Sequence, residues 1–170
     1  MKRQQLSGVL LLAAASCTAQ AEGWYLGASA GVMDANISGF DEATNVGVLV
    51  GYDIFTMDIF SVSLEGELTT TVSDGSVKFG NTKGDWDIDT QAAHVAARIG
   101  NTFYIKVRYG VTRADVSVSV ADSTISGNDT GGTWGGALGW MFSKHWGMQV
   151  DGTLVDPDVT YWNAGVRYQF

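Results

Sequence analysis

One short segment of the sequence has the residue spacing of a catalytic nucleophile. Gly27-Ala28-Ser29-Ala30-Gly31 matches the pattern G-x-S-x-G, in which the serine is exposed at a sharp turn between a strand and a helix. Here the serine lies in a stretch of alternating polarity, which is typical of a β-strand and offers no such turn. We therefore expect Ser29 to face a narrow interior beside other small residues, and we expect no catalytic site.

A serine nucleophile would also need a general base within hydrogen-bond reach. The chain has two histidines, His94 and His145, and neither forms a His-x-Ser pair. The sequence thus indicates a protein that is not an enzyme. A membrane-embedded lipid-modifying enzyme is the less favoured alternative.

Three aspartates at alternate positions, Asp85, Asp87 and Asp89, could offer carboxylates to a divalent cation. The EF-hand pattern is absent, because Asp89 is followed by Thr90 instead of glycine and the position of the bidentate glutamate is Ala96. We therefore expect no metal and no other cofactor.

Charged residues recur on one face of several alternating segments, and we expect them to line the inside of a membrane barrel. A charge that faces lipid costs about 2–4 kcal/mol at the midplane, and a charge inside needs a partner or water. Glu65 and Arg108 lie near the middle of their segments and are the best candidates for a central pair. The full expected network comprises Glu65, Glu67, Asp87, Asp89 and Asp151 as its acidic half and Arg98, Lys106, Arg108 and Arg167 as its basic half.

The composition favours strands as the elements that position these residues. The chain has 170 residues, 45% of them hydrophobic, which suits one folded domain. It contains 22 glycines and one proline, and glycine destabilises helices. The net charge of −8 argues against a surface that binds nucleic acid.

Residues 1–21 are predicted to be a signal peptide. Lys2 and Arg3 precede a short apolar run, and Ala19-Gln20-Ala21 supplies the small residues of a cleavage site. Cleavage there leaves a mature chain of residues 22–170. Cys17 is the only cysteine, so lipidation at a lipobox is the alternative. The cleavage site after Ala21 fits better, because Ala14 stands where a lipobox usually carries leucine.

Residues 22–170 divide into eight segments of alternating polarity, the signature of a membrane barrel. We predict an all-β fold, an eight-stranded antiparallel up-and-down transmembrane β-barrel. Expected long external loops at 34–44, 72–84 and 114–130 alternate with short periplasmic turns, which places both termini in the periplasm. Trp86 and Ile88 have the opposite parity to Ala93 and Val95, so we expect a β-bulge near residues 90–92.

Aromatic residues favour this barrel over a soluble β-sandwich. They are expected to point outward near both ends of the strands, as in the two aromatic girdles of outer-membrane barrels. The periplasmic set is Phe60, Phe103, Phe142, Trp146 and Phe170, and the external set is Trp86, Trp134 and Trp162.

The final segment, Asn163-Ala164-Gly165-Val166-Arg167-Tyr168-Gln169-Phe170, resembles the signal read by the outer-membrane assembly machinery. Asn163, Gly165, Tyr168 and Phe170 occupy its polar, glycine and aromatic positions. The stretches 23–28 and 136–142 resemble the first and sixth strands of the OmpA-like and opacity-type family of eight-stranded outer-membrane barrels. Because the sequence stops at Phe170, the peptidoglycan-binding domain of OmpA is not expected.

This resemblance implies an integral protein of the Gram-negative outer membrane, in contact with its lipids and lipopolysaccharide and inserted by the assembly machinery. We expect a structural or surface-interaction role, because an interior of eight strands is just wide enough for side chains to fill. A narrow porin-like channel for ions or small solutes is the alternative. No motif specifies a surface ligand.

Overall fold

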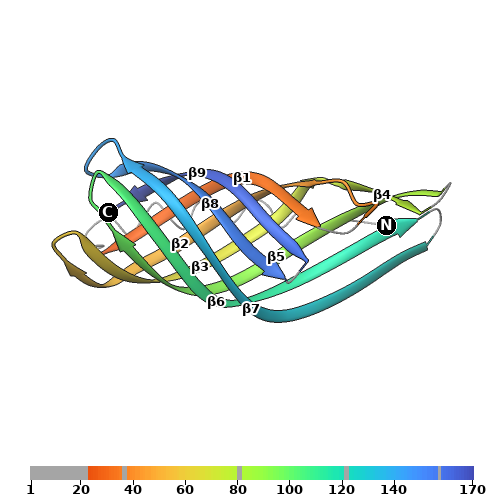
Figure 1. The fold of residues 1–170 in the computed structure, drawn as a ribbon, viewed down its shortest axis with the longest axis horizontal. Coiled ribbons are helices and arrows are strands. Elements are labelled where there is room, and N and C mark those ends of the chain that lie inside the picture. Colours follow the sequence, from red (N-terminus) through yellow and green to blue (C-terminus); the bar gives the residue numbers. More distant parts are fainter. Residues whose placement is uncertain (1–22, 36–37, 80–81, 121–122, 157) are drawn as a thin grey trace.

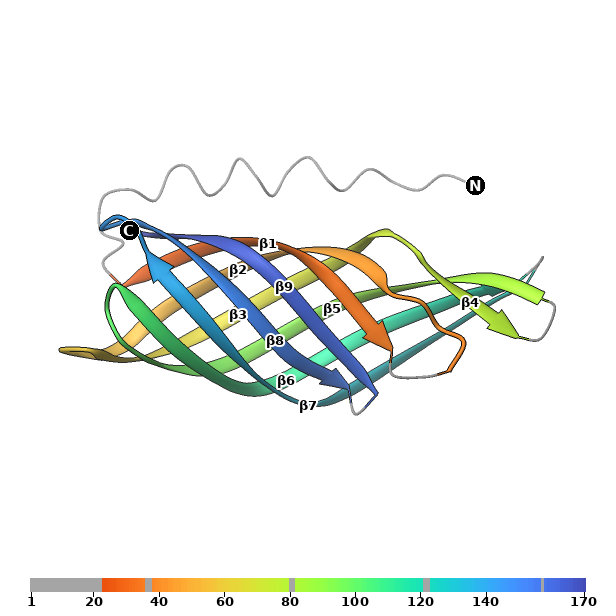
Figure 2. The ribbon, with the colours of Figure 1, turned by 45° about the horizontal axis from the view of Figure 1, so that its top comes forward.

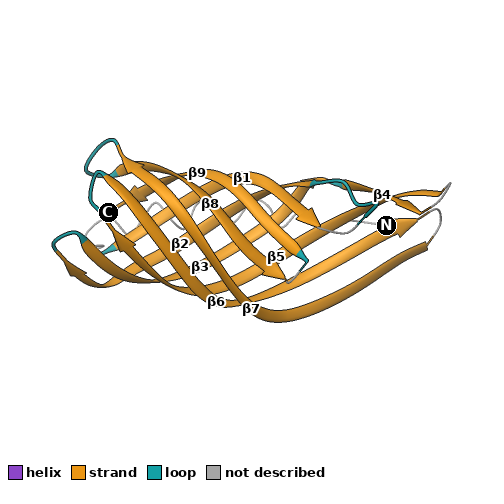
Figure 3. Cartoon of the chain, in the orientation of Figure 1, coloured by secondary structure: helices purple, strands orange, loops and turns teal. Residues whose placement is uncertain are grey.

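The computed structural model describes residues 23–35, 38–79, 82–120, 123–156 and 158–170. The regular elements of this part of the chain are β-strands (Figure 3). No helix in these ranges is long and apolar enough to cross a membrane. The predicted signal peptide, with Cys17 and the cleavage site, lies outside the described residues.

The strands form a closed antiparallel barrel (Figure 1). Strands that follow each other in the sequence pair with each other, except that β3 pairs with β5 instead of β4. The pairing of β1 with β9 completes the cylinder. The short β4 adds to β5 beyond the barrel wall, so eight strands form the barrel. The bounds are β1 Trp24–Ala35, β2 Ala43–Met57, β3 Phe60–Ser73, β4 Gly75–Phe79, β5 Thr82–Ile99, β6 Phe103–Val120, β7 Ser123–Met141, β8 Trp146–Asp156 and β9 Val159–Gln169.

The predicted alternation of inward and outward residues is confirmed along most of the barrel. In β6, Tyr104, Lys106 and Arg108 are buried, whereas the side chains between them are exposed. The outward apolar stretches extend over nine residues, as in Phe103–Val111 of β6 and Trp146–Leu154 of β8. This length matches the 9–11 residues with which a tilted strand crosses a bilayer.

The barrel has two different ends. At the terminal end, β1 begins and β9 ends, and aromatic rings gather on the outer surface. The rings of Phe103 and Trp140 are stacked 6.0 Å apart there. At the projecting end, β5, β6 and β7 run on beyond the other strands (Figure 2).

The projecting sheet replaces two predicted loops. It consists of β4, Thr82–Thr90 of β5, Thr112–Val120 of β6 and Ser123–Gly132 of β7. The expected loop at 114–130 is therefore wrong, because its described residues form the tip of the β6–β7 hairpin, and most of the loop at 72–84 is also strand. Backbone groups here hydrogen-bond across the ladder, so the segment needs no bilayer to remain extended.

The upper part of β5 corrects the predicted inward face. The ladders of β5 with β3 and β6 contain no register shift, so the β-bulge is absent. Trp86 and Ile88 lie inside the barrel at 2% and 0% exposure, whereas Asp87 and Asp89 lie on the outer face. Beyond the outward apolar stretches, the carboxylates turn outward and the apolar residues turn inward, as in a sheet that is surrounded by water. Trp86 is therefore not part of an outer aromatic girdle.

These inward residues belong to an apolar cluster that fills the barrel toward its projecting end. Phe40 packs against Trp86 with the ring centroids 5.8 Å apart. Val116, Val118 and Val159 pack against the same cluster. Its buried members are Met33, Ala35, Ala43, Trp86, Ile88, Ala114, Val155 and Tyr161.

Candidate functional site

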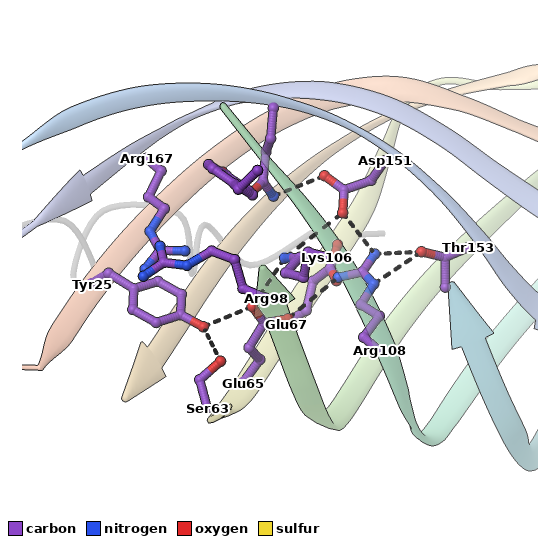
Figure 4. A network of polar contacts seen from close by, with 12 residues as sticks. Tyr25, Ser63, Glu65, Glu67, Arg98, Lys106, Arg108, Asp151, Thr153 and Arg167 are labelled. Carbon is purple, nitrogen blue, oxygen red and sulfur yellow. Dashed lines mark hydrogen bonds and ion pairs between the residues drawn. The ribbon is translucent and has the colours of Figure 1, made fainter. Parts of the chain in front are cut away.

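The middle of the barrel holds a buried cluster of three carboxylates and two cations, contributed by β3, β6 and β8 (Figure 4). Lys106 Nζ lies 2.9 Å from Glu65 Oε1 and 3.8 Å from Asp151 Oδ1. Arg108 Nη1 lies 2.5 Å from Glu67 Oε2, and its guanidinium also bonds the hydroxyl of Thr153. The charged side chains are at most 7% exposed, so each cation is held in low dielectric by more than one oxygen.

A second charged layer lies closer to the terminal end. Arg98 Nη2 and Arg167 Nη2 approach Asp53 Oδ2 at 3.8 and 3.9 Å. The guanidinium of Arg167 lies 3.6 Å from the ring centroid of Tyr25. The Tyr25 hydroxyl lies 2.7 Å from Glu65 Oε1 and donates to it, which joins the two layers.

Together the two layers balance their charges. Four carboxylates, Asp53, Glu65, Glu67 and Asp151, face four cations, Arg98, Lys106, Arg108 and Arg167. Sequence reasoning missed Asp53. The signal was present, because Asp53 has the parity of the inward residues of β2, opposite the apolar face that includes Val50 and Ile54.

Glycines in the barrel wall make room for the two interior tyrosine rings. A Cβ at Gly51 would lie 2.1 Å from Tyr25 Cζ, and one at Gly139 would lie 2.0 Å from Tyr104 Cζ. Both are far inside van der Waals contact, so any side chain at these positions would displace a ring. The Tyr104 hydroxyl donates to Gln149 Oε1 at 3.0 Å, and Gln149 in turn donates to Asp151.

The structure brings seven of the nine predicted network residues into the interior. Asp87 and Asp89 are the exceptions, and their assignment to the lumen is wrong. The proposed central pair is present, but only as the more distant contact. Arg108 Nη1 lies 3.9 Å from Glu65 Oε2, while Lys106 is the closer partner of Glu65. The seven inside are Glu65, Glu67, Arg98, Lys106, Arg108, Asp151 and Arg167.

Several interior polar atoms between the charged layers and the apolar cluster lack a hydrogen-bond partner among the described residues. Both ring nitrogens of His94, the Tyr161 hydroxyl and Asn163 Nδ2 are in this group. Buried polar atoms of this kind are normally satisfied by internal water. His94 lies opposite Glu65 in the β3–β5 ladder, so its ring is next to the charged cluster.

The residues considered for catalysis and metal binding are not arranged for either. Ser29 lies within the continuous strand β1, so the turn of a nucleophile elbow is not formed around it. Within the described ranges, no three His, Cys, Asp or Glu side chains are grouped as metal ligands would be. Asp85, Asp87 and Asp89 point away from the barrel on the outer face of the projecting sheet.

Three of the four predicted assembly residues lie in β9, the strand that closes the barrel against β1, and Phe170 follows it directly. Asn163 and Gly165 pair with Gly31 and Ser29. Tyr168 packs its ring against Trp146 and Phe170 at 4.9 and 5.1 Å between centroids. The Phe170 amide donates to Trp24 O at 3.0 Å.

The free side of β4 is covered by residues 39–41. Asp41 N donates to Ser76 O and Lys78 N donates to Gly39 O, both at 2.8 Å. The Ser76 hydroxyl, which donates to Asp41 Oδ2 at 2.5 Å, and the Lys78 ammonium at 3.6 Å hold the pKa of the Asp41 carboxyl below its usual value. The short segment is thus tied to the sheet by backbone and side chain.

Comparison with known proteins identifies the class that this geometry defines. The chain matches the outer membrane protein beta-barrel domain family over residues 6–170, and it belongs to that family. It is an integral β-barrel of the bacterial outer membrane. No curated protein sequence matches it significantly.

Solved structures of outer-membrane barrels share the fold at low sequence identity. Neisserial surface protein A is 15% identical with a TM-score of 0.60, and the alignment covers 88% of this chain and 98% of that one. Ail, the attachment invasion locus protein of Yersinia pestis, solved with the heparin analogue sucrose octasulfate, is 14% identical (TM-score 0.57, covering 86% and 96%). OprG of Pseudomonas aeruginosa is 15% identical (TM-score 0.57, covering 89% and 98%).

Proposed function

We propose that the protein is a sealed outer-membrane barrel with a structural or surface-interaction role, and that it is neither an open channel nor an enzyme. The observation that carries this proposal is the filling of the interior at two levels. The charged layers occupy the middle and the terminal end, and the apolar cluster occupies the projecting end. A solute would have to separate buried ion pairs and then pass an apolar plug.

The proposed orientation places the projecting sheet outside the cell and both termini in the periplasm. Outer-membrane barrels have short periplasmic turns and longer external segments. The turns at the terminal end are short, as at 58–59 and 100–102. At the other end, β6 runs nine residues beyond the apolar belt, which is the band of outward apolar stretches such as Phe103–Val111. In this orientation the belt contacts outer-membrane lipids and the base of the projecting sheet contacts lipopolysaccharide.

Swelling of proteoliposomes in sugar solutions tests the sealed interior. We expect vesicles that contain the folded protein to swell no faster than empty vesicles, in a preparation where a general porin gives rapid swelling. Rapid sugar uptake through this barrel would replace the proposal with a channel.

A further inference from the structure

The projecting sheet has one open edge. The β6–β7 ladder extends from the tip of the hairpin, but the β7–β8 ladder begins only at Trp134, opposite Leu154. Among the described residues, nothing pairs with Ser123–Gly132 on the side away from β6. Figure 2 shows this part of β7 running beyond the end of β8.

The opposite edge of the same sheet is closed. The segment 39–41 bridges to β4 through two backbone hydrogen bonds, and its Asp41 side chain bonds Ser76 and Lys78. One edge of the projecting sheet is therefore covered by a backbone segment, whereas the other edge is not. Because both edges belong to the same projecting sheet, projection beyond the barrel does not by itself leave an edge unpaired.

The backbone groups that face the open edge can be assigned from the base of β7. Met141 N donates toward β6, to Thr102 O, and Phe142 N donates toward β8, to Trp146 O. The β6–β7 ladder has no register shift, so even-numbered amides of β7 point away from β6 along its whole length. Thr130 N is satisfied by Asp129 Oδ1, which leaves the amides of Thr124, Ser126, Asn128 and Gly132 directed at the open edge.

This edge lacks most of the features that protect exposed strands from pairing. Edge strands are normally blocked by lysine, proline, bulges or short length. Ser123–Gly132 contains no lysine or proline, has Asp129 as its one charged residue, and pairs with β6 without a bulge. Ten extended residues span about 33 Å, which is enough for a partner strand.

The two faces of the sheet specify the side chains that a partner strand would carry. On the inner face Ile125 is 76% exposed, beside Val118, which packs against the apolar cluster. The outer face presents Thr124, Ser126 and Asn128, followed across the sheet by acidic residues. In the described part of the projecting sheet, the outer face carries four aspartates against three cations: Asp85, Asp87, Asp89 and Asp115 against Lys78, Lys83 and Arg113. Asp129 lies on the inner face, on the same side of β7 as Ile125.

We propose that the open edge of β7 binds an extended segment of a partner protein by strand addition, with apolar residues of that segment over Ile125 and basic residues on the acidic outer face. Main-chain hydrogen bonds to residues 124–128 supply affinity, and the alternating side chains supply specificity. The inference rests on the proposed external orientation of the sheet. It adds to the surface-interaction role a site and a chemical class of partner.

A fluorescent nine-residue peptide of alternating valine and lysine is the probe, added to the protein in phosphatidylcholine nanodiscs. We expect saturable binding that empty nanodiscs lack, with slower hydrogen exchange at the amides of residues 124, 126 and 128. Methylation of alternate peptide amides removes the donors and should weaken binding at least tenfold. Replacement of lysine by glutamate should weaken it similarly.

Ser126→Pro is the matched protein variant. It removes an edge-facing N–H without touching the β6 ladder, which is where an edge strand tolerates proline, and Ser126→Thr keeps the N–H as control. We expect at least tenfold weaker binding for Ser126→Pro and unchanged binding for Ser126→Thr. Heat-modifiable mobility in electrophoresis shows whether each variant barrel is folded. If Ser126→Pro does not fold, the binding of the methylated peptide to the unmodified protein tests strand addition instead.

Three results would overturn the inference: no saturable binding, equal binding of the methylated peptide, or equal binding by folded Ser126→Pro. Concentration-dependent dimers that Ser126→Pro abolishes would assign the edge to a second copy instead. None of these results affects swelling of proteoliposomes, so failure of this site and failure of the sealed barrel are distinguishable.

Discussion

Arg108 is the residue on which the interior network converges. Its guanidinium lies within 4 Å of oxygens from Glu65, Glu67 and Asp151, and it bonds Thr153 on β8. Removing one member of a buried ion cluster leaves the others charged without compensation, which costs more than the pair itself contributes.

Arg108→Ala should therefore lower the free energy of unfolding by about 3–5 kcal/mol. The measurement is equilibrium unfolding in guanidinium from lipid vesicles, followed by tryptophan fluorescence. The control is Arg113→Ala, whose exposed pair with Asp115 at 3.5 Å should contribute about 0–1 kcal/mol. Equal losses of unfolding free energy for the two variants would show that the buried ion pairs stabilise the barrel no more than an exposed pair does.

Asp41 gives the projecting sheet a dependence on pH. Its pKa lies below the usual 3.8 because of the Ser76 hydrogen bond and the Lys78 charge. A carboxyl with a depressed folded pKa stabilises the structure above the unfolded pKa, and that stabilisation is lost as the pH falls through the folded pKa.

We expect the amides of Asp41 and Lys78 to show their full protection from hydrogen exchange above about pH 4 and to lose part of it below. The Asp41→Asn variant should show reduced protection at neutral pH and no change across this range. Protection in the unmodified protein that is independent of pH between 2 and 6, after correction for intrinsic exchange, would rule out this contribution.

At the scale of the strands, the bilayer explains why the inward residues of the membrane-spanning segments could be predicted from the sequence. Between Phe103 and Val111 every other residue must be apolar because it faces lipid, so parity identifies the inward residues. Above the belt that constraint is gone. Trp86 and Asp87 alternate just as clearly, but the apolar face turns toward the core, as in a water-soluble sheet.

The pairings inside the barrel could not be predicted from the sequence. Parity places Glu65, Lys106 and Arg108 in the lumen, but the stagger between strands decides that Lys106 is closest to Glu65 and Arg108 to Glu67. Strand stagger is set by barrel closure, which depends on all eight strands at once. Asp53, in contrast, was available from its parity and was overlooked.

Cysteine labelling tests the orientation of upper β5. Cys17 lies in the predicted signal peptide, so a cysteine introduced in residues 22–170 would be unique in the mature chain. A membrane-impermeant maleimide added to intact cells should label Asp87→Cys rapidly and Ile88→Cys much more slowly, because Ile88 is fully buried. Faster labelling of Ile88→Cys than of Asp87→Cys would indicate that Asp87 faces inward, as the sequence predicted with a β-bulge near residues 90–92.

The closing strand β9 carries the resemblance to an assembly signal. Tyr168 packs on Trp146, Phe170 packs on Tyr168, and the Phe170 amide donates to Trp24 O of β1. We expect Phe170→Ala to reduce the amount of folded barrel in outer membranes several-fold at native expression, whereas Phe142→Ala, an aromatic of the same girdle outside β9, should have a smaller effect. Heat-modifiable mobility quantifies the folded fraction, and an unchanged yield for Phe170→Ala would count against the signal.

For the whole molecule, the barrel interior and the projecting sheet differ in charge and in packing. The barrel interior is neutral in sum and filled with paired charges and apolar side chains, which suits a stable plug. Within the described residues, the projecting sheet carries more aspartates than cations and has an edge with no paired strand, and we propose that this edge contacts other molecules. Because side chains fill the interior of this barrel, we assign the proposed interaction to its exterior.

Planar-bilayer recording of the purified, unmodified protein tests the sealed interior most directly. Passage of an ion requires the Lys106–Glu65 and Arg108–Glu67 pairs to separate and the cluster around Trp86 and Tyr161 to part. We predict no steady channel, with at most small and intermittent currents that become more frequent in Arg108→Ala. A steady, large conductance in the unmodified protein, comparable to that of a general porin in the same bilayer, would contradict the account.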